Sequence, residues 1–342
     1  MRNDPYQPFD TLFEKYYGTN PVNTRETVRS LLWTGNIAIV TWLDDNSIHP
    51  EDVTIDDAIN FFEELSENYS ETVQFNKAHM VAFFFSKMND RGWIDIDKNP
   101  FMIALEDHDV LDQVVDRDVK IYSVEEVREV LEELHPIYFT ASMIQLKTTR
   151  RIGGVCNLDM CDVHLDHPGA DWEVVEGLVD KPDHLYFSPK PVKGEVFRGE
   201  VRTDSAKSQT ETYIPIDDEL KDCLLFLLSI RRSSEMTGPL MTNIGSVEPG
   251  KRLRSSSFSS ILNRVAKDKD YYVEPYHPNN IRTHYWRHWT TTHMKDRVNS
   301  SIVDYFRGDK KDMSDHYNHW SEEKARKWVD NIPKIFERYQ RY

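Results

Sequence analysis

The sequence of 342 residues contains no apolar run that approaches the roughly 18 residues needed for a membrane-spanning helix. Its first residues lack the positively charged start and the apolar stretch of a secretory signal. Only three cysteines are present, Cys156, Cys161 and Cys223, and their spacing matches no zinc-binding pattern. An odd number of cysteines suits a reducing compartment better than a disulfide framework. Together these absences predict a soluble cytoplasmic protein.

The sequence also lacks a glycine-rich phosphate loop, an internal repeat and any low-complexity tract. His284 and His288 have the spacing of two metal ligands on one helix face, but no glutamate follows His284 and no third ligand is evident. We therefore expect no nucleotide cofactor and no metal. A metal-dependent hydrolase built on the two histidines remains a minor alternative, which activity in EDTA would eliminate.

The net charge of the chain is −16, but its basic and acidic residues are unevenly distributed along the sequence. Residues 1–135 hold 11 lysines and arginines against 28 aspartates and glutamates, whereas residues 250–342 hold 19 against 12. Only the last quarter has the basic excess that a phosphate backbone would favour, which predicts salt-sensitive binding of nucleic acid. The acidic remainder fits either a salt-adapted surface from a halophilic source or an ordinary acidic protein.

Hydrophobic periodicity predicts that the N-terminal third is a helical bundle. Residues 1–21 show no clear period and are expected to form an arm. Apolar residues at helical spacing predict a helix over 24–43, another that begins at Thr54, and a third over 71–89. We assign residues 22–105 to this helical domain. Residues 106–121 are acidic and weakly patterned, and we assign them to an interdomain linker.

A second domain is expected over residues 122–342. It begins with Ser123 and Glu126, which have the spacing of a capping box before an apolar helical pattern. Residues 184–216 break into short β-like runs separated by glycine, proline and serine, which predicts a small antiparallel sheet. The rest of the second domain is expected to be mainly helical, with an amphipathic tail from about residue 321. The fold class predicted is α+β, mostly helical, with one small sheet.

Four separate segments carry side chains suited to phosphodiester chemistry. His284 and Arg287 stand three residues apart, so they share one face of a helix. Histidine can move a proton near neutral pH, and arginine binds phosphate oxygens with a planar fork. Arg151 precedes an apolar helical pattern, Lys207 lies in a serine-rich turn, and Tyr317 follows a basic polar stretch. Each feature taken alone is more typical of ordinary packing or of a solvated surface than of a catalytic site.

In their order and spacing, these segments resemble the tyrosine recombinase (phage integrase) family. The family's first box, Gly-Leu-Arg-Ile-Ser-Glu-Leu followed by Leu-x-x-x-Asp-Ile, is similar to 149–163 here, which places the first arginine at Arg151. The family lysine stands in a β-hairpin eight residues before a strand proline, as Lys207 stands before Pro215. The second box, His-x-x-Arg-His, is similar to 284–288, and the family's nucleophile lies about thirty residues further on, as Tyr317 does. The resemblance covers about residues 22–320.

The resemblance implies a fold, a reaction and a set of roles. The N-terminal bundle would be a SAM-like core-binding domain on DNA, and the second domain would be catalytic. The implied activity is site-specific recombination of double-stranded DNA through a 3′-phosphotyrosyl intermediate, without cofactor or metal. The implied catalytic residues are Arg151, Lys207, His284, Arg287 and Tyr317. Family members act as homo-tetramers on two DNA duplexes, and the free protein is expected to be a monomer or a weak oligomer. The tail would dock on a neighbouring protomer, although packing on its own domain is equally compatible with the sequence.

Two departures from the family pattern leave alternatives open. Gly154 replaces the acidic residue that usually follows the first arginine by three positions. The usual Leu-Gly-His before the tyrosine reads Phe306-Arg307-Gly308-Asp309, so the third-box histidine is unmatched. The residues that could replace it are Asp309, Arg307, Lys310 and His316. The competing interpretations are a type IB topoisomerase or plasmid-dimer resolvase with the same chemistry, and a non-catalytic DNA-binding regulator with the same fold.

Overall fold

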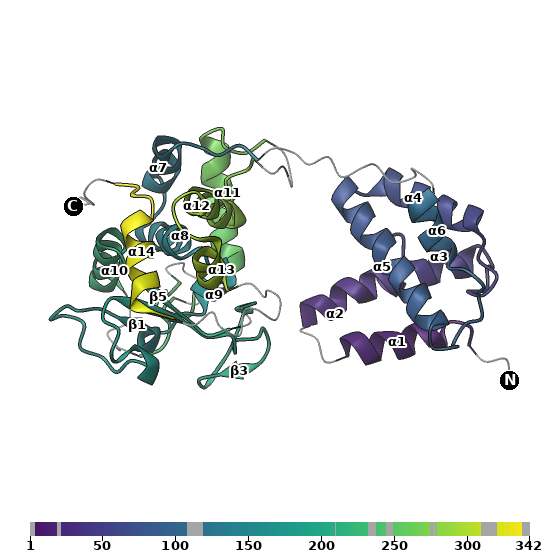
Figure 1. Cartoon of the computed structure of the whole chain (residues 1–342), viewed down its shortest axis with the longest axis horizontal. Helices are drawn as coiled ribbons and strands as arrows, with labels where there is room; N and C mark the ends of the chain where they lie inside the picture. The colour runs from purple at the N-terminus through teal and green to yellow at the C-terminus, as the bar shows by residue number, and fades with distance from the viewer. Residues whose placement is uncertain are drawn as a thin grey trace. The chain divides into compact units, whose positions relative to one another are not determined.

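The computed structural model describes residues 4–18, 22–107, 119–208, 210–231, 237–243, 249–273, 277, 279–308 and 320–336. The chain divides into two compact units, Met1–Arg117 and Asp118–Tyr342, each with its own hydrophobic core (Figure 1). Within the described ranges, no helix combines the length and the apolar character needed to cross a bilayer.

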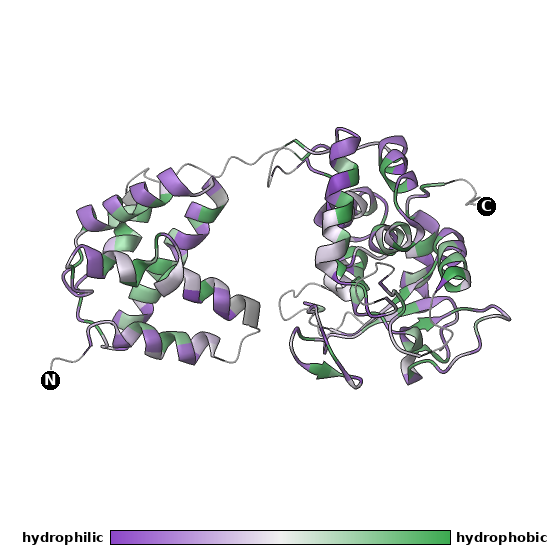
Figure 2. Ribbon diagram, turned by 180° about the vertical axis from the view of Figure 1, so that it is seen from behind, coloured by the Kyte–Doolittle hydropathy of each residue, from purple (hydrophilic) through white to green (hydrophobic). Residues whose placement is uncertain are grey.

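The first unit is a bundle of short helices packed around aromatic side chains. Its elements are α1 (Gln7–Tyr17), α2 (Val22–Arg29), a π-helix (Ser30–Thr34), α3 (Ile39–Asp45), α4 (Ile55–Asn68), α5 (Glu71–Asn89) and α6 (Pro100–Asp107). Phe61, Phe85 and Phe101 are completely buried at its centre, with ring centroids 4.6–6.0 Å from that of Phe101. In Figure 2 the helices carry both hydrophilic and hydrophobic segments, as amphipathic helices of a small bundle should.

Two features of the first unit differ from the sequence-based expectation. Residues 7–17 are not an arm but the helix α1, which buries Phe9, Leu12 and Phe13 in the core. The three apolar residues occupy one side of a helix of only 11 residues, which is too short to give a clear period. The helix expected over 24–43 is interrupted where Gly35 adopts an extended conformation after the π-helix. The expected start at Thr54 is confirmed, since Thr54 and Asp57 form a reciprocal capping box.

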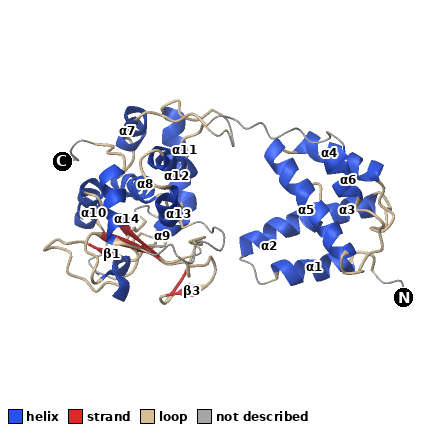
Figure 3. Ribbon diagram, viewed as in Figure 1, coloured by secondary structure: helices blue, strands red, loops and turns tan. Residues whose placement is uncertain are grey.

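The second unit combines helices with two small antiparallel sheets. Figure 3 draws the helices blue and the strands red. Its helices are α7 (Val124–Glu132), α8 (Pro136–Thr148), α9 (Ile152–Cys156), α10 (Asp218–Ile230), α11 (Ser255–Asp268), α12 (Thr283–Lys295), α13 (Ser300–Arg307) and α14 (Glu322–Asn331), with short 3-10 turns at Met160–Asp162 and Glu176–Leu178. Its strands are β1 (Val163–His164), β2 (His184–Phe187), β3 (Val196–Phe197), β4 (Glu200–Val201) and β5 (Thr212–Pro215). The fold class predicted from the sequence is confirmed.

The structure contains two separate sheets, whereas the sequence suggested one. One sheet has the order β1-β2-β5, with His184 paired to Pro215 and Phe187 paired to Thr212. Strands β3 and β4 form a separate hairpin between β2 and β5. Helices α13 and α14 both pack against β5. The strand β1 lies outside the range 184–216 in which strands were expected, because two residues are too short to produce a periodic signal.

Helix α8 is the axis of the second unit. Nearly all of its residues are buried, and it packs against α7, α9, α10, α11 and α12. The capping box expected for α7 is present, with Ser123 accepting from the Glu126 amide and Glu126 accepting from the Ser123 amide. Because α8 is held from all sides, the segment that leaves its C-terminal end has a fixed starting point.

The tail packs on its own unit as far as the structure describes it. Trp328 of α14 is buried and donates from its indole nitrogen to the Lys147 carbonyl at 3.0 Å. Lys147 is itself buried, 2.7 Å from Asp217 and 2.5 Å from Glu219. Glu219 also accepts from the amide of Ile335 at 3.1 Å. Of the two alternatives left open by the sequence, residues 320–336 therefore follow the intramolecular one.

Candidate active site

Four arginines from three separate parts of the second unit line one small cavity. It is a small hollow that is open to solvent and about the size of one water molecule. Its described lining consists of Arg150, Arg151, Gly154, Phe187, Ser188, Ala206, Ser208, Arg287 and Arg307. None of these nine lining residues is acidic. A cavity lined by several guanidinium groups and by small polar side chains is suited to bind an anion.

The first two arginines lie in the turn between α8 and α9. Helix α8 ends at Thr149, which adopts the left-handed conformation with φ of 56° and reverses the chain. Arg150 follows with only 2% of its surface exposed, and its guanidinium lies 5.0 Å from the centre of the Phe187 ring. Arg151, which caps α9, is half-buried and donates to the Lys207 carbonyl at 3.3 Å. The turn therefore directs two consecutive guanidinium groups into the same cavity.

The third arginine comes from α12, as the sequence predicted. Arg287 is 1% exposed, and its Nη1 donates to the Thr149 carbonyl at 2.7 Å and to the Arg307 carbonyl at 2.9 Å. One buried guanidinium group thus holds the end of α8 to the end of α13. Charge-assisted hydrogen bonds of this kind fix the side chain in the cavity wall before any ligand arrives.

The fourth arginine lies at the C-terminal end of α13. Arg307 donates to the Thr291 hydroxyl at 3.3 Å, and Gly308 then ends the helix in the left-handed conformation with φ of 64°. A β-carbon at Gly308 would lie 1.8 Å from Nη1 of Arg150, so no other residue fits there without displacing that guanidinium. Of the four possible replacements for the third-box histidine, Arg307 has a place in the cavity wall. Asp309, Lys310 and His316 lie outside the described residues.

Lys207 lies at the edge of this cavity, in the segment between β4 and β5. It is not at the tip of a hairpin of paired strands, since β4 pairs with β3 and β5 pairs with β2. Its backbone adopts a φ of 52°, and its side chain is exposed. The segment packs closely on α9, where a β-carbon at Gly153 would lie 2.4 Å from the Ser205 carbonyl oxygen. The structure thus brings the backbone of Lys207 to Arg151 and leaves its ammonium group in solvent.

His284 lies on α12 together with Arg287. Its side chain keeps contact with solvent. Desolvation by neighbouring atoms, followed by the positive charges of Arg287, Arg151 and Arg307, lowers the pKa of His284 below its usual 6.5. A histidine with a lowered pKa is neutral at pH 7, so it can accept a proton there.

We expect His284 to titrate below pH 6.5 in the free protein, because desolvation and then the charges of the three arginines disfavour its protonated form. Below that pH the unfolded chain binds the proton more readily, so protonation of this group lowers the free energy of unfolding as the pH falls. The measurement is an NMR titration of the histidine ring, assigned by the resonance lost in His284→Asn. A midpoint that does not rise toward 6.5 in Arg151→Gln would contradict the proposed electrostatic cause.

Tyr317 lies outside the described residues, in the stretch 309–319 between Gly308 and Trp320. Of the other tyrosines near the C-terminus, Tyr305 belongs to α13 and is 9% exposed, with its hydroxyl 3.5 Å from the Tyr213 amide. Burial raises the pKa of Tyr305 to about 12. A buried phenol with a raised pKa is a poor nucleophile, which disfavours Tyr305 as an alternative to Tyr317.

Arg150 is the residue in the cavity that sequence reasoning missed. It occupies the position where the family motif has leucine, directly before the first arginine. No role was predicted for it, although a charged residue at an apolar position of a motif is a signal in itself. The structure shows it buried between Phe187, Ser208 and Arg307.

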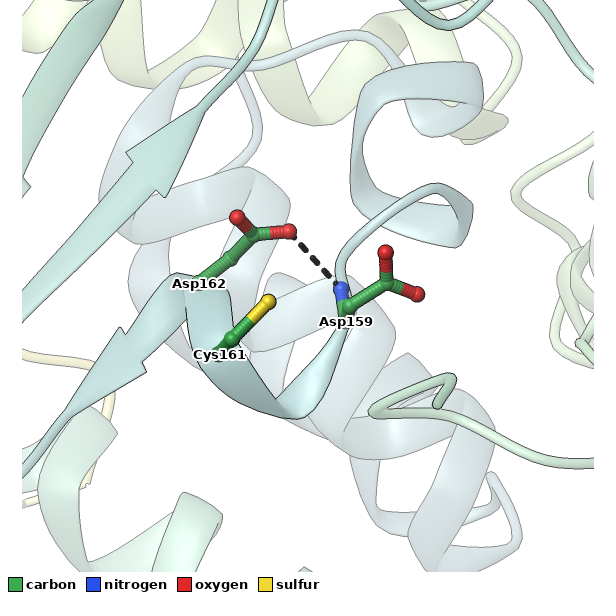
Figure 4. A group of neighbouring side chains, drawn as sticks. All are labelled: Asp159, Cys161 and Asp162. Atoms are coloured by element: carbon green, nitrogen blue, oxygen red, sulfur yellow. Dashed lines mark hydrogen bonds between the residues drawn. The ribbon is translucent and has the colours of Figure 1, made fainter. Parts of the chain in front are cut away.

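A separate cluster of Asp159, Cys161 and Asp162 has side-chain atoms close enough to suggest a metal site (Figure 4). The carboxylates are instead engaged by arginines: Asp159 lies 2.8 Å from Arg202, and Asp162 lies 2.8 Å from Arg198. Burial raises the pKa of the Cys161 thiol to about 11, which keeps it protonated and a poor metal ligand. The cluster anchors the segment around β3 and β4 to the turn after α9. It is the sole group of this kind within the described ranges, where nothing adds a third ligand to His284 and His288.

Comparisons with known proteins identify the fold. No model of a protein family matches the chain, and no curated protein matches it. Among solved structures, the Tn1549 transposon integrase in complex with transposon right end DNA matches with a TM-score of 0.65 and 18% identity, over 95% of this chain and 98% of that one. A lambda integrase dimer bound to a COC′ core site matches with a TM-score of 0.61 and 12% identity, over 98% of both chains. A lambda integrase tetramer bound to a Holliday junction matches with a TM-score of 0.60 and 13% identity, over 93% of this chain and 79% of that one. The chain therefore has the fold of the integrases, the proteins that its motifs resemble.

Proposed function

We propose that this chain is a tyrosine-type site-specific DNA recombinase that cuts and rejoins DNA through a covalent phosphotyrosine at Tyr317. The observation that carries the proposal is the convergence of Arg150, Arg151, Arg287 and Arg307 on one cavity. The solved integrases with the same fold are bound to DNA, which supports double-stranded DNA as the source of the anion.

The cavity suits a phosphodiester in its transition state better than in its ground state. When an oxygen nucleophile attacks phosphorus, negative charge grows on the two nonbridging oxygens. Arg151 and Arg287 would each donate in pairs to these oxygens, and such preorganised donors lower the barrier where the charge develops. Because Arg287 is already fixed by two backbone carbonyls, its position costs no reorganisation at the moment of reaction.

The proposed reaction conserves the energy of the phosphodiester bond. The Tyr317 hydroxyl oxygen attacks phosphorus and gives its proton to neutral His284, directly or through water. The bond from phosphorus to the 5′ oxygen breaks, Lys207 protonates that oxygen, and a 3′-phosphotyrosine remains. A 5′-hydroxyl of another strand then attacks the phosphotyrosine, forms the new phosphodiester and returns the tyrosine. The steps need neither a metal nor a nucleotide from outside.

We extend the proposal to the assembly. One solved integrase of the same fold is a tetramer bound to a Holliday junction. Strand exchange between two duplexes needs four active sites, because four strands are cut and joined. A homo-tetramer on two DNA duplexes, formed from a free monomer or weak oligomer, would meet this need.

The test is a DNA substrate nicked close to the cleavage site, which loses a short fragment after cleavage and so traps the covalent intermediate. With EDTA present, we expect a protein–DNA adduct that survives denaturation, and mass spectrometry should place the nucleotide on Tyr317. Binding without an adduct would instead identify a regulator, and an activity lost in EDTA would identify a hydrolase. Relaxation of supercoiled DNA without exchange between two sites would identify a topoisomerase.

A further inference from the structure

The segment that carries Lys207 is fastened to its surroundings at almost every residue. The Asn157 side chain donates to the Asp204 carbonyl at 2.8 Å, and the Ala206 amide donates to the Pro191 carbonyl at 2.9 Å. Arg151 donates to the Lys207 carbonyl, as described above. Because Lys207 adopts a positive φ without being glycine, its conformation depends on such contacts.

Arg150 supplies the last of these contacts and adds a second attachment. Its Nη1 donates to the Ser208 hydroxyl at 3.0 Å and also to the Arg307 carbonyl at 3.4 Å. Ser208 directly follows Lys207, and Arg307 directly precedes the segment that leads to Tyr317. One buried guanidinium group therefore joins the segment of the general acid to the end of α13.

Burial alone does not set Arg150 apart, since Arg287 is just as deeply buried, but the contacts of Arg150 do favour this bridging role. Only 2% of its surface is exposed, whereas Arg151 beside it is half-buried. The Phe187 ring covers its guanidinium group at 5.0 Å, and Gly308 leaves room for its Nη1. An arginine enclosed in this way is held by the protein itself.

We infer that Arg150 is a positioning residue that acts through Lys207, by holding the Lys207 segment against the C-terminal end of α13. The inference rests on the proposed function, in which Lys207 protonates the departing 5′ oxygen. It differs from the role of Arg151 and Arg287, which would contact the phosphate directly.

The experiment uses two nicked DNA substrates that differ in one atom. A substrate with sulfur in place of the bridging 5′ oxygen has a leaving group that needs no protonation, because a thiolate is a far weaker base than an alkoxide. Lys207→Ala sets the reference: its cleavage rate should fall by about 100-fold or more on the oxygen substrate and recover on the sulfur substrate. Failure of Lys207→Ala to recover would remove Lys207 as the acid, and the inference with it.

Arg150→Met should show the same pattern at smaller amplitude. We expect a loss of about 10-fold to 100-fold on the oxygen substrate, and recovery to near the wild-type rate on the sulfur substrate. The double variant with Lys207→Ala should be no slower than Lys207→Ala alone, because both changes remove one function. An equal loss on both substrates, or a wild-type rate on the oxygen substrate, would overturn the inference.

The fold should tolerate the change, since both acceptors keep another partner. The Ser208 hydroxyl still donates to the Thr210 carbonyl at 2.9 Å, and the Arg307 carbonyl still accepts from Arg287. A second variant, Ser208→Ala, breaks the same tether while keeping the Arg150 charge, and should give the same substrate dependence. It decides the question if Arg150→Met fails to fold.

Arg231→Met is the matched control. Arg231 also ties a loop through backbone carbonyls, those of Thr237 and Pro239, and it does not line the cavity. Its replacement removes the same charge and should leave both cleavage rates unchanged. The outcomes separate the two proposals. Absence of an adduct with the wild-type protein overturns the proposed function, whereas a wild-type adduct with a loss in Arg150→Met that sulfur does not restore overturns only the inference on Arg150.

Discussion

Tyr317→Phe is expected to bind its DNA site with unchanged affinity and to form no covalent adduct. The change removes one oxygen atom, and without that atom no bond to phosphorus can form. Removal of a nucleophile lowers the cleavage rate by about 10⁴-fold or more. The measurement is the fraction of nicked DNA that remains attached to the protein after denaturation, together with a binding assay at the same salt concentration.

Tyr305→Phe is the control for this variant. It removes a tyrosine hydroxyl from α13, where the ring is buried and burial holds the pKa of the phenol at about 12. Its adduct yield should match that of the wild-type protein. If Tyr317→Phe still forms the adduct, then the nucleophile is another residue, and Tyr339 and Tyr342, which lie outside the described residues, become the next candidates.

Arg151→Lys should lower the cleavage rate by about 100-fold to 1000-fold, which is the usual cost of losing one preorganised donor to a developing oxyanion. Lysine keeps the charge but loses the planar fork that binds two oxygens at once. Arg151 is half-buried, so water can still solvate the ammonium group of a lysine at this position. The substitution should therefore leave the fold unaffected. Single-turnover cleavage of the nicked substrate measures the effect.

The loss in Arg151→Lys should persist on the substrate with the bridging sulfur, since phosphate oxygens still need stabilising when the leaving group does not. Arg282→Lys is the matched control: Arg282 is half-buried, donates to a backbone carbonyl, that of His277, and lies outside the cavity wall. Recovery of Arg151→Lys on the sulfur substrate would place Arg151 with the positioning residues and leave Arg287 as the phosphate ligand.

Long, strongly patterned elements were predictable from the sequence, and features created by tertiary contact were not. The capping boxes at Thr54 and Ser123 depend on residues three apart, so they are visible in the sequence. The helix α1 was missed because it is short and only three of its residues are buried, which gives a weak period. The hairpin of β3 and β4 was merged into the main sheet, because strands of two residues show no period.

The candidate site was predictable where chemistry follows a motif. Arg287 lies in the cavity wall, and Arg151 lies there too. The position of Tyr317 next to this cavity stays a prediction, because Tyr317 lies outside the described residues. Arg150 was not predictable as a cavity residue, since its burial depends on Phe187 and on the absence of a side chain at Gly308, which are distant in the sequence. Residue spacing locates groups along one helix, but it does not tell which separate segments meet.

The crowding of four guanidinium groups in one cavity links substrate binding to conformational stability. Like charges held within a few ångströms of one another raise the energy of the folded state when the cavity is empty. A bound phosphodiester would neutralise part of this repulsion, and any ligand that binds only the native state raises its stability. The folded chain would thus store strain of an electrostatic kind, which the phosphodiester of the proposed function would release as a counterion.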